Sequence, residues 1–143
     1  MTTSRGLAQM TPKQLLDQSD DQYMESEQTA FFRDLLLSQR RDAIARIETL
    51  RSDMAGLEKA ADEVDVALNE QERQALLGGI DRENQNLRDI KLALDAIDDG
   101  EYGWCADTGE KIGLARLLSN PRSLLTVEAK QRRENRARHQ RAA

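Results

Sequence analysis

The chain has 143 residues, enough for one domain of ordinary size, with 33% charged and only 3% aromatic residues. That balance is typical of long helices with solvated faces rather than of a thick globular core. The net charge of −5 argues against a general nucleic-acid binder, because phosphate contacts require clustered positive charge.

Cysteine and hydropathy patterns indicate the compartment. Cys105 is the only cysteine, which excludes an intrachain disulfide and favours a reducing cytoplasm. No apolar run approaches the roughly 18 residues that a membrane span needs. Residues 1–10 lack the apolar stretch of a signal peptide.

A short helix is predicted over residues 11–17. Thr11 is a favourable N-cap and Pro12 follows at the first helical position, where proline is tolerated. Leu15 and Leu16 give this helix an apolar face, which we expect to lie across a globular base.

Two heptad seams then predict two long helices, over about 26–60 and 69–99. The first seam contains Leu36, Ala43, Ile47, Leu50, Met54 and Leu57, with Arg40 as its polar gap. The second contains Leu76, Ile80, Leu87, Ile90, Leu94 and Ile97, with Glu83 as its polar gap. Asn69 and Glu72 resemble a capping box at the start of the second helix, and Gly100 is a natural C-cap.

A short connection makes the two helices antiparallel, with a tip at residues 61–68. At 1.5 Å per residue each arm is about 45–50 Å long. One continuous helix in an intermolecular coiled coil is the alternative. Gly78 and Gly79 mark either a bend in the second arm or a tolerated weak point.

A turn-rich segment follows Gly100. Its apolar residues predict a small core and are Trp104, Ile112, Leu114, Leu117 and Leu118. Thr126 can cap a last helix over about 127–140. A base of about 45 residues usually needs a staple such as a metal or a disulfide.

Three motifs occur in order along the chain. They are Tyr23-Met24-x-x-Glu27-Gln28-x-x-x-Phe32, then Asp62, Asp65 and Ala67 as Asp-x-x-Asp-x-Ala, then Tyr102-Gly103-x-Cys105-x-x-Thr108-Gly109-x-x-Ile112-Gly113-x-x-Arg116-Leu117 with Pro121. With them, over about residues 23–130, the chain resembles the DksA/TraR family, bacterial factors that bind RNA polymerase through its secondary channel.

The resemblance implies roles for the predicted tip. Asp62, Asp65 and Ala67 would reach the polymerase active centre, where chemistry depends on Mg²⁺ and phosphates. From the residues alone, the two acids are more simply solvated loop acids or helix caps. Arg82, on the second arm, matches a position of polymerase contact.

The resemblance also implies guanosine tetraphosphate as an effector at the polymerase interface. Lys130 matches one position where a basic group pairs the alarmone's phosphates. The two others hold Asp89 and Asn120, which are not basic. Arg88, Lys91 and Arg122 are adjacent, but adjacency on a helix means a rotation of about 100°.

Zinc-type members of the family carry four cysteines at positions held here by Cys105, Thr108, Thr126 and Ala129. Because a structural zinc site needs four good ligands, we expect no zinc, as in a zinc-independent branch of the family. The base would then be held by packing around Trp104, Leu117, Leu125 and Val127. Cys105 is read as a small buried hydrophobe, with a redox-sensing thiol as the alternative.

The predicted fold is mostly all-α: a long antiparallel coiled-coil hairpin on a small globular base, with a degenerate zinc-finger-like region and a C-terminal helix. The domains are an N-terminal segment packing on the base (1–32), the hairpin (33–98), the finger-like region (99–125) and the C-terminal helix (126–143). That last helix is basic, which fits either a solvated helix end or contact with nucleic acid or an acidic rim of polymerase.

The predicted function is a monomeric regulator that modulates initiation at ribosomal RNA, stress and amino-acid promoters, with no sequence-specific DNA binding and no membrane. No nucleophile–base set or phosphate loop indicates an enzyme. The rival predictions are a scaffolding coiled coil and a transcript-cleavage-like factor whose tip acids hold a second Mg²⁺.

Overall fold

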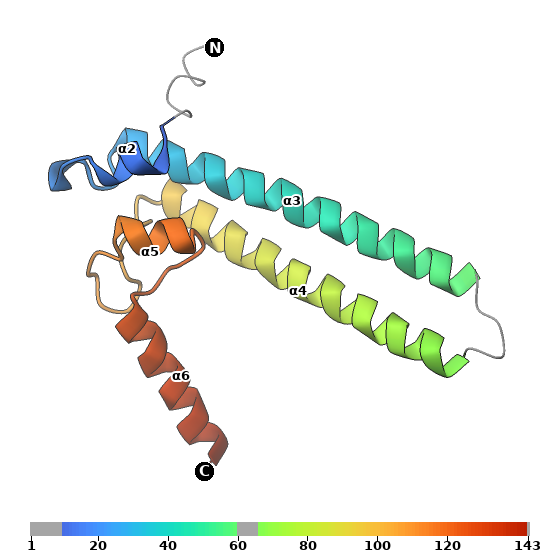
Figure 1. Cartoon of the computed structure of the whole chain (residues 1–143). Coiled ribbons are helices and arrows are strands. Elements are labelled where there is room, and N and C mark those ends of the chain that lie inside the picture. The colour runs from blue at the N-terminus through green and yellow to red at the C-terminus, as the bar shows by residue number, and fades with distance from the viewer. Residues whose placement is uncertain (1–9, 60–65, 143) are drawn as a thin grey trace. The chain divides into compact units, whose positions relative to one another are not determined.

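The computed structural model describes residues 10–59 and 66–142, and within these ranges it is helical with no strand (Figure 1). The elements are α2 (Pro12–Leu16), the 3-10 turn η1 (Asp20–Gln22), α3 (Ser26–Lys59), α4 (Val66–Asp98), α5 (Leu114–Ser119) and α6 (Val127–Ala142). They form two compact units. The arm unit spans Leu37–Lys91, and the base unit combines the chain up to Leu36 with the chain from Leu92 onward. None of the described helices has the length and apolar character needed to cross a membrane.

The arm unit is a pair of antiparallel helices, the C-terminal part of α3 against most of α4 (Figure 1). On α3, the predicted seam residues Ala43 and Ile47 are buried, whereas Arg40 is exposed. On α4, Ile90 is buried, and so is Glu83 at the polar gap. The two seams therefore face each other, as a heptad pattern requires.

Glycine lets the two arm helices approach closely. α4 continues unbroken through Gly78 and Gly79, so the pair does not interrupt the helix. Gly79 is buried and faces Leu50 of α3, and a Cβ built on Gly79 would lie 3.2 Å from Leu50 Cδ1. The helix-destabilising residue thus serves as a packing site, while Ile80, predicted for the seam, is only half-buried.

The start of α4 differs from the prediction. The helix begins at Val66, so Asn69 lies inside its first turns and the predicted capping box is wrong. Ala67 and Leu68 favour the helical conformation, which allows the helix to begin before Asn69. Ala67 and Leu68 are exposed, and the rest of the predicted tip, residues 61–65, lies outside the described residues with Val66 opening the helix.

The base unit has its core beneath α2. Thr11 and Gln14 form a capping box, and α2 packs against α5, which places Leu15 and Leu117 fully inside. The remaining buried apolar residues include Phe32, Ile97, Tyr102, Cys105, Ile112 and Ala129. The ring of Phe32 lies 5.6 Å from that of Tyr102, so this pair supplies the aromatic centre of the base.

Three residues predicted to hold the base are largely outside the core. Trp104 is 37% exposed, Val127 46% and Leu16 49%, so their assignment to the core is wrong. Trp104 follows a turn and pairs with Lys111 in an isolated antiparallel bridge, where its ring meets Tyr23 edge-to-face at 5.4 Å and leaves one side in solvent. Leu16 follows the buried Leu15 directly, and adjacent residues on a helix point about 100° apart.

Tyr23 joins the start of α3 to two turns of the base. Its hydroxyl donates to the carbonyl oxygen of Gly103 and accepts the N–H of Gly113 at 3.0 Å. Burial raises the pKa of Tyr23, although the backbone contacts at Gly113 and Ile112 oppose that rise. The hydroxyl therefore stays protonated at neutral pH and can act as donor and acceptor together.

Candidate functional site

The predicted tip is only partly described. Asp62 and Asp65 lie outside the described residues, so their assignment remains a prediction. Ala67 lies in the first turn of α4 and is exposed.

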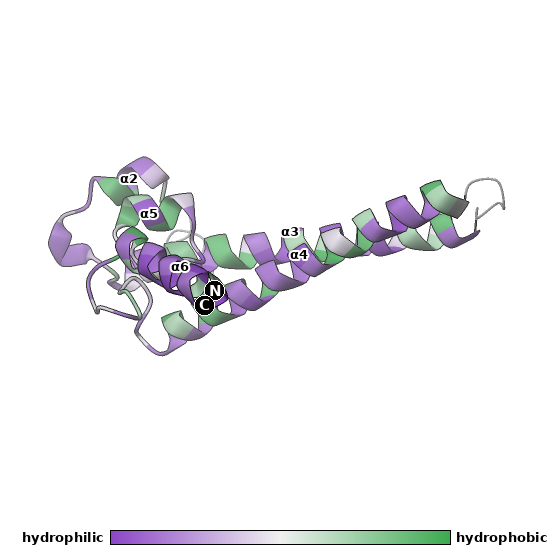
Figure 2. Ribbon diagram, turned by 90° about the horizontal axis from the view of Figure 1, so that it is seen from below, coloured by the Kyte–Doolittle hydropathy of each residue, from purple (hydrophilic) through white to green (hydrophobic). Residues whose placement is uncertain are grey.

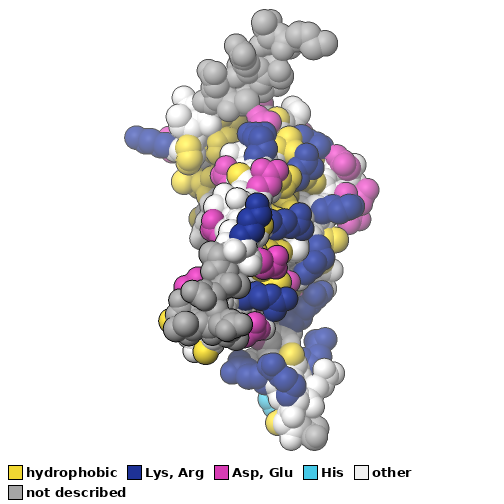
Figure 3. Space-filling view, turned by 90° about the vertical axis from the view of Figure 1, so that its right-hand side faces the viewer, with side chains coloured by type: hydrophobic (Ala, Val, Ile, Leu, Met, Phe, Trp, Pro, Cys, Tyr) yellow, Lys and Arg dark blue, Asp and Glu magenta, His cyan; other side chains and the backbone are white. Residues whose placement is uncertain are grey.

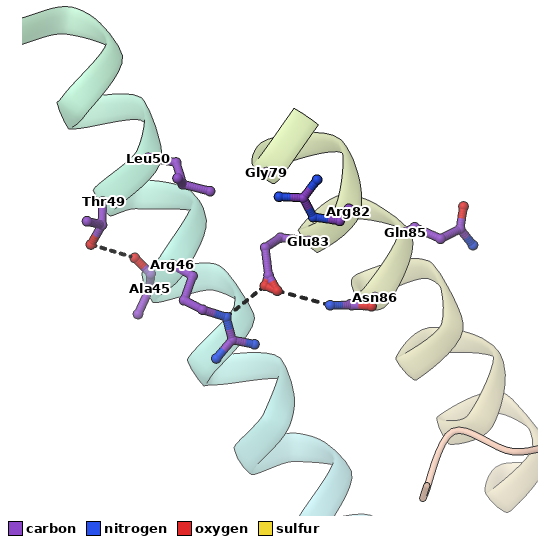
Figure 4. Close-up of a pocket in the computed structure, with 9 residues that line it drawn as sticks. All are labelled: Ala45, Arg46, Thr49, Leu50, Gly79, Arg82, Glu83, Gln85 and Asn86. Atoms are coloured by element: carbon purple, nitrogen blue, oxygen red, sulfur yellow. Dashed lines mark hydrogen bonds and ion pairs between the residues drawn. The ribbon is translucent and has the colours of Figure 1, made fainter. Parts of the chain in front are cut away.

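Arg82 lies in a groove of about 700 Å³ between the arm helices (Figure 4). The groove is lined by Ala45, Arg46, Thr49, Leu50, Gly79, Arg82, Glu83, Gln85 and Asn86. The side chain of Arg82 is near the glycine pair, because a Cβ built on Gly78 would lie 3.5 Å from its Nη1. Arg82 is exposed, as a residue that contacts a partner must be.

An ion pair between an exposed arginine and a buried glutamate crosses the arms beside this groove. Arg46 Nε donates to Glu83 Oε2 at 2.7 Å, and Asn86 Nδ2 donates to Glu83 Oε1 at 3.0 Å (Figure 4). Glu83 is only 8% exposed, and its hydrogen bond raises the pKa of Arg46. The carboxylate at the polar gap is thus satisfied by two donors, which a buried charge requires.

The four zinc-type positions form a connected cluster in the base unit. The N–H of Thr126 donates to Cys105 Sγ at 3.4 Å, and Thr126 Oγ1 lies 3.8 Å from the same sulfur. Thr126 Oγ1 also accepts the N–H of Ala129 at 3.2 Å, which caps α6. Hydrogen bonds join these positions where zinc-type members have thiolates.

Cys105 is surrounded by donors. Burial raises the pKa of its thiol, but the Thr108 hydroxyl and backbone contacts at Thr126, Asp107 and Thr108 outweigh this and lower the pKa to about 6. The donors around the sulfur favour the thiolate form, which gives this buried side chain a polar environment. Cys105 is buried, as predicted from the sequence.

This donor set does not fit a structural zinc ion. Zinc prefers thiolate, imidazole or carboxylate ligands in a closed set of four. The cluster offers one sulfur, two threonine hydroxyls already engaged with neighbouring groups, and the methyl group of Ala129. Among residues 10–59 and 66–142, no group of three or more His, Cys, Asp or Glu side chains could hold a metal ion.

Other contacts close the base around this cluster. Asp107, two residues after Cys105, accepts two hydrogen bonds from the Arg133 guanidinium of α6. Arg116 Nε donates to the Leu125 carbonyl at 2.9 Å. The hydroxyl of Tyr102 donates to the Pro121 carbonyl at 2.7 Å. The Arg133 and Tyr102 bonds tie α6 and the segment after α5 to the turns after Gly100, and the Arg116 bond joins α5 to the segment before α6.

The three positions that the resemblance implies for alarmone binding lie on three different helices or their ends. Lys130 is exposed on α6, and Asn120 is the half-buried C-cap of α5. Asp89 lies on α4, where its carboxylate accepts a hydrogen bond from Gln85 at 2.9 Å. Lys130 and Asn120 belong to the base unit and Asp89 to the arm unit.

Comparison with known proteins identifies the family. The family described as "Prokaryotic dksA/traR C4-type zinc finger" matches residues 100–135. The RNA polymerase-binding transcription factor DksA of Caulobacter vibrioides is 36% identical over 120 residues, 83% of this chain and 84% of that protein. Its namesake in Escherichia coli (strain K12) is 33% identical over 113 residues, 77% of this chain and 74% of that protein.

A solved structure agrees over nearly the whole chain. The structure of transcription factor DksA2 from Pseudomonas aeruginosa has a TM-score of 0.82 and 46% identity, and it covers 90% of this chain and all of its own. Both the sequence relatives and this fold therefore place the chain in the DksA/TraR family.

Proposed function

We propose that this protein regulates transcription by binding RNA polymerase through the secondary channel, with the arms carrying Asp62 and Asp65 toward the active centre. The observation that carries the proposal is the similarity to RNA polymerase-binding factors over 83% of the chain. The paired arm helices support it, because helices of 34 and 33 residues at about 1.5 Å per residue are long enough to reach into a channel.

The tip acids are tested by one substitution. Asp65→Asn keeps the size of the side chain but removes its charge, so we expect unchanged binding to polymerase and loss of promoter regulation. Native gel shift measures binding, and multiple-round transcription from a ribosomal RNA promoter measures regulation. Retained inhibition by the variant would contradict the assigned role, as would loss of binding.

The exposed groove residue Arg82 is proposed to contact polymerase. Arg82→Ala should weaken binding to polymerase while leaving the arms folded, because the side chain is exposed and helix propensity is preserved. Arg73→Ala, on the same helix and also exposed, is the matched control. Equal binding by both variants would remove Arg82 from the interface.

We propose that the base folds without zinc, since the cluster around Cys105 offers one suitable ligand. Guanosine tetraphosphate is proposed as an effector with Lys130 as one phosphate contact, and Lys130→Ala should abolish any response to the alarmone without changing basal binding. An effect of the alarmone that survives in Lys130→Ala would refute that contact.

We propose a monomeric transcription factor with no catalytic activity of its own, acting in the cytoplasm where bacterial polymerase works. A molecular mass near 16 kDa in solution favours the monomer over a scaffolding coiled coil, which would give a dimer. RNA cleavage in stalled complexes, dependent on Asp62 and Asp65, would instead support the transcript-cleavage alternative.

A further inference from the structure

The C-terminal helix concentrates positive charge. α6 holds six Lys or Arg and two Asp or Glu, a net charge of +4 that leaves −9 on the rest of the chain. Its cations are Lys130, Arg132, Arg133, Arg136, Arg138 and Arg141. All residues from 130 to 142 are exposed, and Lys and Arg side chains gather on the lower end of the face in Figure 3, where α6 lies.

Three of these arginines meet in a groove. Arg132, Arg133 and Arg136 line a hollow of about 600 Å³ together with Asp107, Thr108, Ala137 and Gln140. Positions 132, 136 and 140 are spaced four apart and therefore share a helix face, with 133 and 137 beside them. Arg138 is turned to the opposite side of the helix.

Arg133 is engaged by Asp107, which leaves Arg132 and Arg136 as the groove arginines that could contact a ligand. Both carboxylate oxygens of Asp107 accept hydrogen bonds from Arg133, which anchors α6 to the turn after Cys105. The pKa of Asp107 is lowered by the Arg133 hydrogen bond first and by the nearby charges of Arg136 and Arg132 as well. In the described part of the chain, Arg132 and Arg136 have no ion pair within 4 Å.

The helix lacks what a protein-docking surface needs. Protein interfaces have an apolar centre, often aromatic, inside a polar rim. From Lys130 to Ala142 the apolar side chains are Ala137 and Ala142, and α6 is hydrophilic along its length in Figure 2. Nucleic-acid interfaces are instead polar and strongly positive, and arginine binds phosphate oxygens through two parallel hydrogen bonds.

We propose that the groove face of α6 binds the phosphate backbone of a nucleic acid, with Arg132 and Arg136 on the phosphates, without reading base sequence. Arg133 acts as a positioning residue through Asp107. Sequence independence follows from the chemistry, because phosphate contacts fix position but carry no base information. The overall charge of −5 does not oppose this, since the positive charge is confined to one helix.

Fluorescence anisotropy of the full chain with a labelled oligonucleotide of about 20 nucleotides, single-stranded or duplex, tests the proposal through its salt dependence. Two phosphate contacts predict a slope of log affinity against log salt of about −1.8 on the duplex, or about a 12-fold loss between about 50 and 200 mM salt. Arg132→Gln/Arg136→Gln should bind at least about 10-fold more weakly and bring the slope close to zero, because both proposed contacts are removed.

Two matched controls separate the groove from general charge. Arg40→Gln/Arg41→Gln removes the same charge from exposed positions of α3, and Arg138→Gln/Arg141→Gln removes it from α6 outside the groove. Both should bind within about 3-fold of the unchanged protein, since a phosphate contact contributes mainly where it is made. Circular dichroism checks that the total helical content is unchanged in each variant.

Each result of these binding measurements either supports or overturns the phosphate site on α6. A selective loss with Arg132→Gln/Arg136→Gln supports the site, and the preferred strand form identifies whether single-stranded or duplex nucleic acid supplies the phosphates. Equal losses with either control pair would overturn it. So would absence of binding by the unchanged protein, or equally tight binding to a labelled polyglutamate of the same charge, which would assign the helix to an acidic protein segment.

Discussion

Gly103→Ala is expected to destabilise the base unit strongly. Gly103 has φ of +97°, a conformation that residues with a side chain rarely adopt. A Cβ at this position would lie 2.5 Å from Met24 Cγ, 2.9 Å from Met24 Sδ and 3.1 Å from the Tyr23 hydroxyl. The Met24 side chain must therefore move, next to a tyrosine whose hydroxyl bonds both Gly103 and Gly113.

The size of the effect has two sources. The backbone conformation costs a residue with a Cβ about 1–2 kcal/mol. Forcing an extra methyl group into a packed site costs about 1–3 kcal/mol more, so the total is about 2–5 kcal/mol. Small domains have total stabilities of about 5–15 kcal/mol, so this loss is a large part of the whole.

Gly100→Ala measures the backbone cost of a positive φ on its own. Gly100 has φ of +75°, but a Cβ there would have no atom within 4 Å, so only the backbone cost of about 1–2 kcal/mol applies. Gly56→Ala, in the last turn of α3 with open space around it, should stabilise the helix by up to about 0.5–1 kcal/mol.

Urea unfolding measures all three variants. Trp104 is the only tryptophan and lies edge-on to Tyr23, so its fluorescence reports the base, while far-ultraviolet circular dichroism is dominated by the long helices. If Gly103→Ala and Gly100→Ala shift the tryptophan transition equally, the Met24 and Tyr23 contacts do not oppose a side chain, and the packing described for Gly103 is wrong.

Three further outcomes follow from the described contacts. Arg46→Ala should destabilise the arms by only about 1 kcal/mol, because Asn86 still donates to buried Glu83 and because Arg46 is 57% exposed and screened by solvent. Glu83→Leu completes the apolar seam and should be neutral or stabilising. Thermal melts in which Glu83→Leu is less stable than Arg46→Ala would contradict this. The pKa of Cys105 in the folded protein is below its unfolded value, so the thiolate's contribution to stability is complete above about pH 9 and is lost as pH falls toward about 6. The ultraviolet absorbance of the thiolate should therefore titrate near pH 6, and Cys105→Ala should remove this part of the pH dependence of stability. A titration midpoint above about pH 8 would refute the prediction. Metal chelators should leave the unfolding transition unchanged, and one zinc per chain by atomic absorption would disprove the zinc-free base.

The helical architecture could be predicted because its signals are periodic or local. The heptad seams identified both arms, Thr11 and Pro12 identified the start of α2, and Gly100 adopts the positive φ expected after a helix. The zinc-type positions could be placed together because the family spacing was recognised. These features depend on neighbours along the chain or on a motif of fixed length.

The missed features depend on contacts between distant residues. Glu83 was recognised as a polar gap, but its partner Arg46 is 37 residues away, and the pairing depends on the register of the two arms. Tyr23 lies 80 residues from Gly103, and no periodic pattern links a hydroxyl to a turn carbonyl. Trp104 was assigned to the core on hydrophobicity alone, which does not reveal which face of a turn is covered.

Localised cleavage tests the central claim most directly. An iron chelate placed at the polymerase active-site Mg²⁺ position generates cuts in any bound chain near it. The account predicts binding of this protein to polymerase and cuts confined to residues near 61–68. Absence of binding, or cuts in α6 or the base instead of the tip, would contradict it.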